Sequence, residues 1–194
     1  MKIKPIESII KNKRSIQIRV DENNVQWLGD GAAFYPLHGF PKLNEEKIFR
    51  FLDVAKDKQN KYTYSEGDFP IGFQLQDNLP SDKLLKQSDL RIVDGGVKLL
   101  PLYADSGMIF INERYLAPFA DEENGFELYE RKGIGQTLIA VKTGFLLAGL
   151  IAPMQFNNEK ELCAICAQLA AKPYVETEED SAQLSMEGEE YADL

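Results

Sequence analysis

The sequence has no long apolar run, few cysteines and almost no histidine, and each shortage excludes a class of protein. Its longest apolar stretch, residues 145–154, is interrupted by a glycine and a proline, and a membrane-spanning helix needs about 20 apolar residues. Cys163 and Cys166 are the only cysteines, so a disulfide scaffold is excluded and a reducing cytoplasm is expected. His38 is the only histidine, which excludes most zinc enzymes because too few Cys and His ligands remain.

Charge is distributed unevenly along the chain. The 194 residues carry a net charge of −9, yet the segment from Glu176 to Leu194 holds eight acidic residues and no basic one. The rest of the chain is therefore almost neutral. Residues 1–14 are rich in lysine and are expected to form a basic N-terminal arm, whereas residues 173–194 have few large apolar groups and are expected to form an acidic, flexible tail.

The apolar pattern predicts many short strands and few helices. Alternating or continuous apolar positions bounded by Gly, Asn and Asp predict strands over 15–20, 25–28, 32–37, 62–64, 71–75, 108–111, 126–131, 137–142 and 145–151, and a hairpin over 90–100. Helical spacing predicts helices over 45–54 and 159–171, each starting after an asparagine cap, with a short helix over 80–87 and one turn over 113–116. The strand over 145–151 is apolar on both faces and is expected at the centre of a sheet.

Together these elements predict an α+β fold of antiparallel sheets with few helices. The length of the chain favours one domain or two small packed halves.

The sequence contains no convincing catalytic or metal-binding constellation. The Cys163-x-x-Cys166 pair lies in the second turn of a predicted helix among apolar residues, a position more typical of packing than of redox or metal chemistry. Gly133-Ile134-Gly135 lacks the third glycine and the following helix of a phosphate loop, and a hairpin turn explains it. A small enzyme that uses Cys163 or His38 remains an alternative, but we predict no catalytic residue, no metal and no cofactor.

Basic residues supply the candidate nucleic-acid contacts. Lys47 and Arg50 lie on one face of the predicted 45–54 helix, and the N-terminal arm adds Lys11, Lys13 and Arg14. Such cations bind phosphates without reading base sequence, although two residues on a helix are more typical of a solvated face.

The order of elements after residue 107 resembles a module of DNA sliding clamps. Residues 108–116 resemble the strand and short helix that open such a module, and residues 126–131, 136–141 and 145–154 resemble its closing strands, which run into a Pro-Met ending, here Pro153-Met154. Residues 15–88 can be laid out in a similar way, so the resemblance implies a first α+β module over 15–88 and a second over 90–172 that ends in the C-terminal helix.

The resemblance implies a ring that encircles duplex DNA and tethers a polymerase. Rings of this family contain six modules, so two modules per chain imply a homo-oligomer of three copies, in which Lys47 and Arg50 face phosphates from inner helices. A replication-protein peptide would dock in an apolar pocket close to Pro153 and Met154. The stretch Gln183-Leu184-Ser185-Met186 itself resembles the short peptides with which replication proteins bind bacterial sliding clamps, which makes Leu184 a further partner-binding candidate.

We therefore predict a non-enzymatic, cytoplasmic, clamp-like protein of phage or prophage origin that contacts duplex DNA and tethers a replication partner. The alternative is a phage or mobile-element scaffold module that binds only protein and is regulated by the acidic tail.

Overall fold

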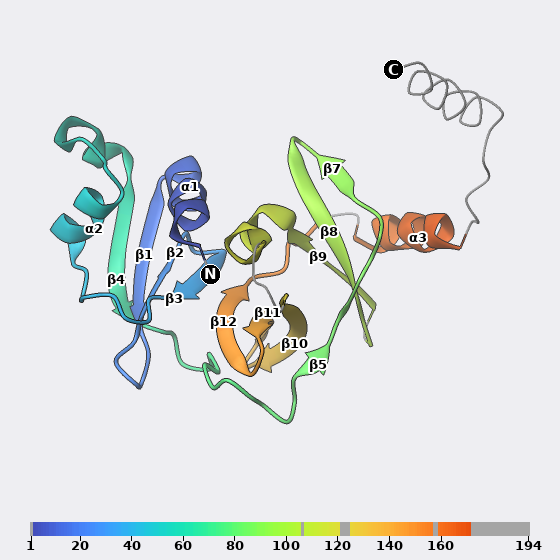
Figure 1. The fold of residues 1–194 in the computed structure, drawn as a ribbon. Coiled ribbons are helices and arrows are strands. Elements are labelled where there is room, and N and C mark those ends of the chain that lie inside the picture. The colour runs from blue at the N-terminus through green and yellow to red at the C-terminus, as the bar shows by residue number, and fades with distance from the viewer. Residues whose placement is uncertain (1, 106, 121–124, 157–158, 172–194) are drawn as a thin grey trace, which may run out of the picture. The chain divides into compact units, whose positions relative to one another are not determined.

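The computed structural model describes residues 2–105, 107–120, 125–156 and 159–171. The chain forms two compact units, Met1–Phe156 and Asn157–Leu194. The first unit holds two β-sheets with short helices, and the described part of the second holds helix α3 (Glu159–Ala170) (Figure 1). The predicted α+β class is confirmed. Within the described ranges, no helix has the length and apolar character needed to cross a membrane.

The larger sheet has eight strands in the order β4-β1-β2-β3-β12-β11-β10-β5. Their bounds are β1 (Ser15–Val20), β2 (Gln26–Gly29), β3 (Ala33–Pro36), β4 (Thr63–Asp68), β5 (Lys83–Leu84), β10 (Glu127–Gly133), β11 (Gln136–Thr143) and β12 (Leu146–Ile151). Neighbours are antiparallel except β1 and β4, which are parallel. Ile151 of β12 pairs with Ala33 of β3, so β12 lies at the centre of the sheet, as its apolar pattern predicts.

The smaller sheet is built around one long strand. β8 (Val97–Ala104) pairs antiparallel with β9 (Gly107–Asn112) and, on its other edge, with two short strands, β6 (Lys86–Gln87) and β7 (Ile92–Asp94). The 3₁₀-helix η2 (Glu113–Phe119) follows β9, and the Asn112 side chain caps it by accepting a hydrogen bond from the Arg114 N–H at 3.2 Å. The hairpin and the helical turn expected in this region are both present.

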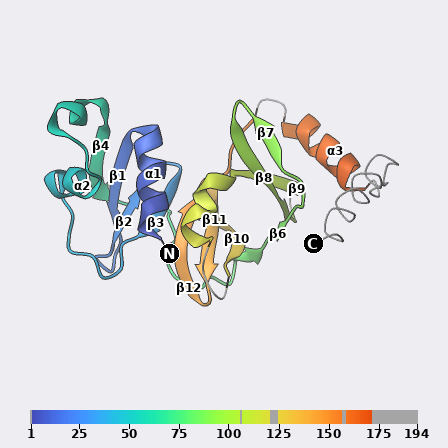
Figure 2. The ribbon, with the colours of Figure 1, turned by 45° about the horizontal axis from the view of Figure 1, so that its top comes forward.

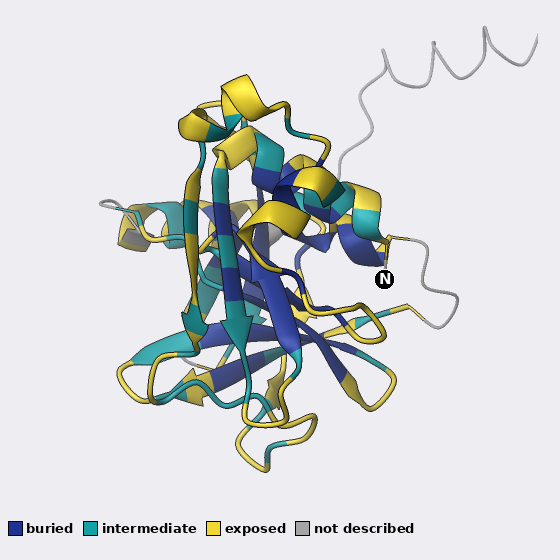
Figure 3. Ribbon diagram, turned by 90° about the vertical axis from the view of Figure 1, so that its left-hand side faces the viewer, coloured by how far each residue is buried: buried dark blue, intermediate teal, exposed yellow. Residues whose placement is uncertain are grey.

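Helices cover one face of the large sheet and create the main core. α1 (Ile3–Lys13) and α2 (Glu45–Phe51) bury isoleucines against the strands, and η2 adds Tyr115, Leu116 and Phe119. The predicted asparagine cap of α2 is confirmed, because the Asn44 side chain accepts from the Lys47 N–H at 3.0 Å. Figure 3 shows the burial that results: α1 is buried towards the sheet and exposed on its outer side.

The opposite face of the large sheet carries a second apolar cluster. Side chains of β2, β3, β11 and β12 on this face form it. Aromatic residues of the loop that follows β4 cover it, and Phe69 is in edge contact with both Trp27 and Phe34. The loop, residues 69–82, has no regular structure apart from turns. Something other than a strand ladder must therefore hold it in place.

A buried ionic cluster, which we call the clip, fastens this loop to the sheet. Its members are Asp82 in the loop and Arg131 and Lys142 on β10 and β11. Arg131 donates to both Asp82 oxygens, at 2.9 and 2.6 Å, and to the carbonyls of Gln74, Gln76 and Asp77. Lys142 Nζ lies 2.9 Å from Asp82 Oδ2. Burial disfavours the ionised carboxylate, but these hydrogen bonds outweigh it, so the pKa of Asp82 is lowered from its ordinary value.

Three expectations about local structure were wrong. Residues 3–13, expected as part of a basic arm with no helix, form a helix because Ile6, Ile9 and Ile10 share one face and are buried. Residues 71–75 form no strand, since the clip takes carbonyls from this loop. Residues 80–87 form β5 and β6 in place of a helix, because the chain crosses from one sheet to the other there.

The expected division into two modules at residue 89 also differs from the structure. Strands from both sides of that position form the eight-stranded sheet, and residues 1–156 form a single compact unit. The acidic tail and the asparagine cap expected for α3 lie outside the described residues.

Candidate nucleic-acid interface

The C-terminal end of α1 places basic side chains at one end of the large sheet. Lys11 and Lys13 lie in the last turn of the helix, where cations interact favourably with the helix dipole. Arg14 ends the helix in a left-handed conformation with φ 53°, and its N–H donates to the Ile10 carbonyl at 2.8 Å. The chain then enters β1 directly, so the direction of α1 and the start of the sheet fix where these cations lie.

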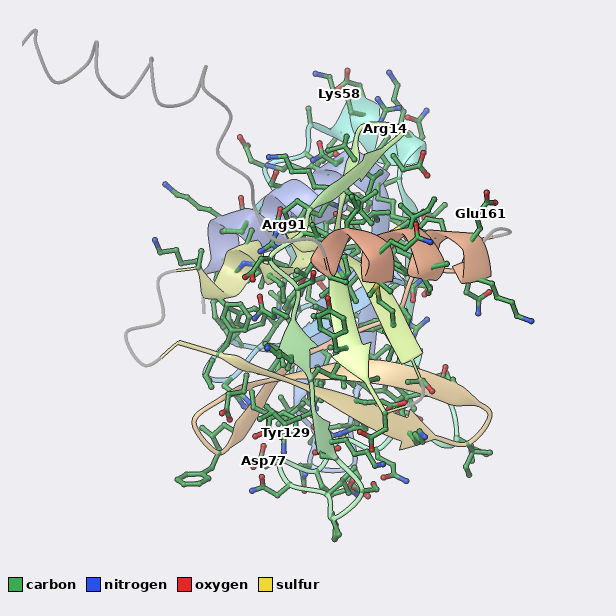
Figure 4. All side chains as sticks on the ribbon, turned by 90° about the vertical axis from the view of Figure 1, so that its right-hand side faces the viewer. Arg14, Lys58, Asp77, Arg91, Tyr129 and Glu161 are labelled. Atoms are coloured by element: carbon green, nitrogen blue, oxygen red, sulfur yellow. The ribbon has the colours of Figure 1, made fainter. Side chains whose placement is uncertain are left out.

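A second basic segment reaches the same end of the sheet from a distant part of the chain. The 3₁₀-helix η1 (Lys56–Lys61) immediately precedes β4, and the Thr63 N–H at the start of β4 donates to the Arg14 carbonyl at 2.9 Å. Parallel pairing of β1 with β4 thus brings η1 beside the end of α1 (Figures 1 and 2). Figure 4 shows Arg14 and Lys58 together at this end.

We call Lys13, Arg14, Lys58 and Lys61 the basic corner. All four are exposed in the structure. Lys13 has an acidic neighbour, the buried Asp30, at 3.7 Å. Among the described residues, Arg14, Lys58 and Lys61 form no ion pair. Three of the four cations of the corner therefore have no ion-pair partner in the described part of the protein.

The other predicted contacts lie outside the basic corner, and each has a partner of its own, as Lys13 does. Arg50 forms an ion pair with Glu46 at 2.8 Å, one turn earlier on α2, and both side chains are mostly exposed. Lys47 Nζ donates to the Lys42 carbonyl at 3.2 Å, and Lys11 lies 4.0 Å from Glu7. The predicted set thus divides: Lys13 and Arg14 join the basic corner, whereas Lys11, Lys47 and Arg50 do not.

A buried polar cluster around Asp30 lies next to Lys13 of the basic corner. Asp30, in the turn between β2 and β3, accepts hydrogen bonds from the Ala32 and Ala33 N–H groups and from the Tyr115 hydroxyl at 2.8 Å. Burial, followed by the charge of Asp30, raises the pKa of Tyr115 to about 12, so this hydroxyl remains a donor. Asp30 therefore ties the β2–β3 turn to η2 and lies close to the last turn of α1, which positions Lys13.

The predicted partner-binding residues lie elsewhere. Pro153 and Met154 follow β12 and are partly exposed, and the Met154 N–H donates to the Phe110 carbonyl of β9 at 2.8 Å. This hydrogen bond connects the segment after β12 to the small sheet. Leu184 lies outside the described residues.

The candidate catalytic residues, His38 and the two cysteines, lie on separate elements. His38 is exposed in the loop after β3, and Cys163 and Cys166 of α3 are not joined by a disulfide. Burial, followed by the neighbouring Cys163, raises the pKa of Cys166, which is the opposite of the thiolate stabilisation that a redox pair requires. Over the described part of the chain, no group of three or more His, Cys, Asp or Glu is arranged to hold a metal ion.

Sequence reasoning missed Lys58 and Lys61. The run from Lys56 to Lys61 contains three lysines and one aspartate, so its charge is visible in the sequence. Its proximity to Arg14 is not visible, because it depends on the parallel pairing of β1 with β4.

Comparisons with family models, with curated proteins and with solved structures found no match to this chain. The resemblance to sliding clamps remains a prediction.

Proposed function

We propose that this chain is a non-enzymatic, clamp-like replication protein that contacts the phosphate backbone of duplex DNA through the basic corner. The observation that supports the proposal is the convergence of Lys13, Arg14, Lys58 and Lys61 at one end of the sheet, three of them unpaired in the described residues. Residues 2–14 and 45–61 together carry ten Lys and Arg against five Asp and Glu, in a chain whose net charge is −9. A local cationic surface in an acidic protein favours a polyanionic partner.

Salt dependence is the physical signature of such contacts. Each phosphate that a cation neutralises releases condensed counterions, and the logarithm of the affinity falls with the logarithm of salt by about 0.9 per contact. Four contacts thus predict a slope of roughly −3.6, without preference for base sequence.

The test is fluorescence anisotropy with a labelled duplex of random sequence, titrated between about 50 and 200 mM salt. The Arg14→Glu, Lys58→Glu double variant should bind much more weakly and with a shallower salt slope. The matched control is the Lys47→Glu, Arg50→Glu double variant, which makes the same change in charge on α2. Equal loss in both variants, or no binding by the unchanged protein at low salt, contradicts the proposal.

Ring closure and partner tethering are tested separately. Light scattering after size-exclusion chromatography should give the mass of a homo-oligomer, and the protein should be retained longer on circular duplex DNA than on linear duplex DNA. A monomer at every concentration contradicts the ring and leaves the DNA contact to be judged by anisotropy.

A further inference from the structure

A groove of about 610 Å³ lies beside η2. It is bounded by the β7–β8 hairpin on one side and by η2 and the start of β10 on the other; Figures 1 and 2 show η2 beside β8. Its volume is within the range of specific ligand sites, about 300–1,000 Å³. All of its lining residues belong to the unit Met1–Phe156.

The floor of the groove is apolar. Leu100 of β8 and Leu116 of η2 reach it from the main core, and the partly buried Phe126 lies at one end. An apolar side chain of a ligand would be buried from water against this floor, which favours binding.

The polar groups of the groove carry a surplus of positive charge. Its charged lining residues are Arg91, Lys98, Arg114 and a single acid, Glu113. Arg91 Nε donates to Glu113 Oε1 at 2.7 Å, and its NH1 group donates to the Ser88 and Leu90 carbonyls, so Arg91 is held in place and Glu113 is neutralised. Lys98 is exposed and forms no ion pair with any described residue.

Arg114 adds an unsatisfied donor. Its guanidinium carbon lies 5.2 Å from the centre of the Tyr115 ring, and its NH2 group forms an ion pair with Asp30 at 3.6 Å. Its Nε–H, by contrast, is buried and has no hydrogen-bond partner in the described structure. Buried donors are almost always satisfied in proteins, so this atom calls for an acceptor that the described chain does not supply.

We infer that the groove binds an acidic peptide segment of a partner protein, with an apolar side chain on the Leu100–Leu116 floor and a carboxylate beside Lys98 and Arg114. Charge complementarity favours this occupant, because Glu113 is already paired with Arg91, Lys98 has no anion among the described residues, and the Arg114 Nε–H lacks an acceptor. Arginine binds carboxylates through short, charge-assisted hydrogen bonds, which suits it to this occupant. The inference does not depend on DNA binding.

The test uses the full chain and a fluorescein-labelled probe peptide, Gly-Asp-Glu-Leu-Phe-Glu-Asp-Gly. It should bind with measurable affinity, whereas a version with lysine at the four acidic positions and a version with Ser-Ser in place of Leu-Phe should not. Lys98→Glu should weaken binding of the acidic peptide about tenfold or more, because it places like charges together. Amide resonances of Val97, Ala117 and Phe126 should shift in the nitrogen-correlated NMR spectrum when the peptide is added.

Lys86→Glu is the matched control. Lys86 lies on β6, next to a residue that lines the groove, but does not line it itself, and forms no ion pair with described residues. Both substitutions make the same change in net charge at an exposed position. The inference is overturned if the two variants bind the peptide equally, if the lysine peptide binds as well as the acidic one, or if duplex DNA displaces the peptide. The Arg14→Glu, Lys58→Glu variant should still bind the peptide, which separates this inference from the DNA proposal.

Discussion

Two groups of cations in this protein carry the same charge in opposite surroundings. In the clip, Arg131 and Lys142 are buried and share the carboxylate of Asp82, and Arg131 also binds three backbone carbonyls. In the basic corner, Arg14 and Lys58 are exposed and have no acidic partner among the described residues. A buried cation must be satisfied internally because desolvation is costly, whereas an exposed one is hydrated and free to meet a partner. The clip should therefore control stability, and the corner should control binding.

The largest effect is expected from Arg131→Met, which keeps the volume of the side chain and removes its charge. It leaves three carbonyls of the covering loop without their donor and the Asp82 carboxylate with Lys142 alone. We expect a loss of about 4 kcal/mol in the free energy of unfolding, measured by urea denaturation. An unchanged midpoint means that the clip does not hold the loop.

Asp82→Asn should have the next largest effect, lowering the free energy of unfolding by about 3 kcal/mol at pH 7, because two buried cations then lack an anion. The pKa of Asp82 is lowered in the folded protein, so its carboxylate stabilises the fold above the unfolded pKa, and this stabilisation is lost as pH falls through the folded pKa. The difference between Asp82→Asn and the unchanged protein should therefore shrink in acid, starting below about pH 4. A difference that is constant with pH contradicts the ionic account.

Lys142→Met should lower the free energy of unfolding by less, about 1.5 kcal/mol. Removing it leaves a balanced pair, Asp82 with Arg131, together with one lost hydrogen bond to Asn78. The same urea experiment should compare the stability lost in Lys142→Met with the stability lost in Arg131→Met. Equal costs would show that the two cations of the clip have equivalent roles, contrary to their different numbers of contacts.

The smallest effect on stability is expected at the basic corner. Arg14→Glu and Lys58→Glu should each change the free energy of unfolding by less than about 0.5 kcal/mol, because neither side chain has a described partner to lose. Arg14→Gly is a useful comparison, since a left-handed φ of 53° suits glycine and should leave the helix end intact. A large loss of stability in Arg14→Glu would mean that the corner is part of the framework.

Local elements were the part of the fold that could be predicted. The strands over 15–20 and 146–151, the 90–100 hairpin and the Asn44 cap depend on alternation, turn residues and a capping side chain, all of which act over a few residues. The helix over 3–13 could also have been recognised, because Ile3, Ile6 and Ile10 recur at helical spacing. The lysines of this segment predict a basic arm, but its apolar residues share one helical face.

The candidate sites were only partly predictable. Lys13 and Arg14 were identified from local charge, but Lys58 and Lys61 join them through a strand pairing that no local pattern specifies. The groove has no counterpart in the sequence analysis, because Lys98 and Arg114 meet across two elements, β8 and η2. Residues 80–87 carry helix-forming signals, yet pairing of Leu84 with Tyr129 and of Lys86 with Tyr103 draws them into two sheets.

The amino-acid sequence alone determined the α+β class, the antiparallel hairpins and the uneven charge, since these follow from periodicity, turn chemistry and composition over short distances. Tertiary structure alone decided which cations are buried in the clip and which remain open at the corner and in the groove. The physical reason is that the cost of a charge depends on the dielectric and the partners around it, and those come from segments far apart in the chain.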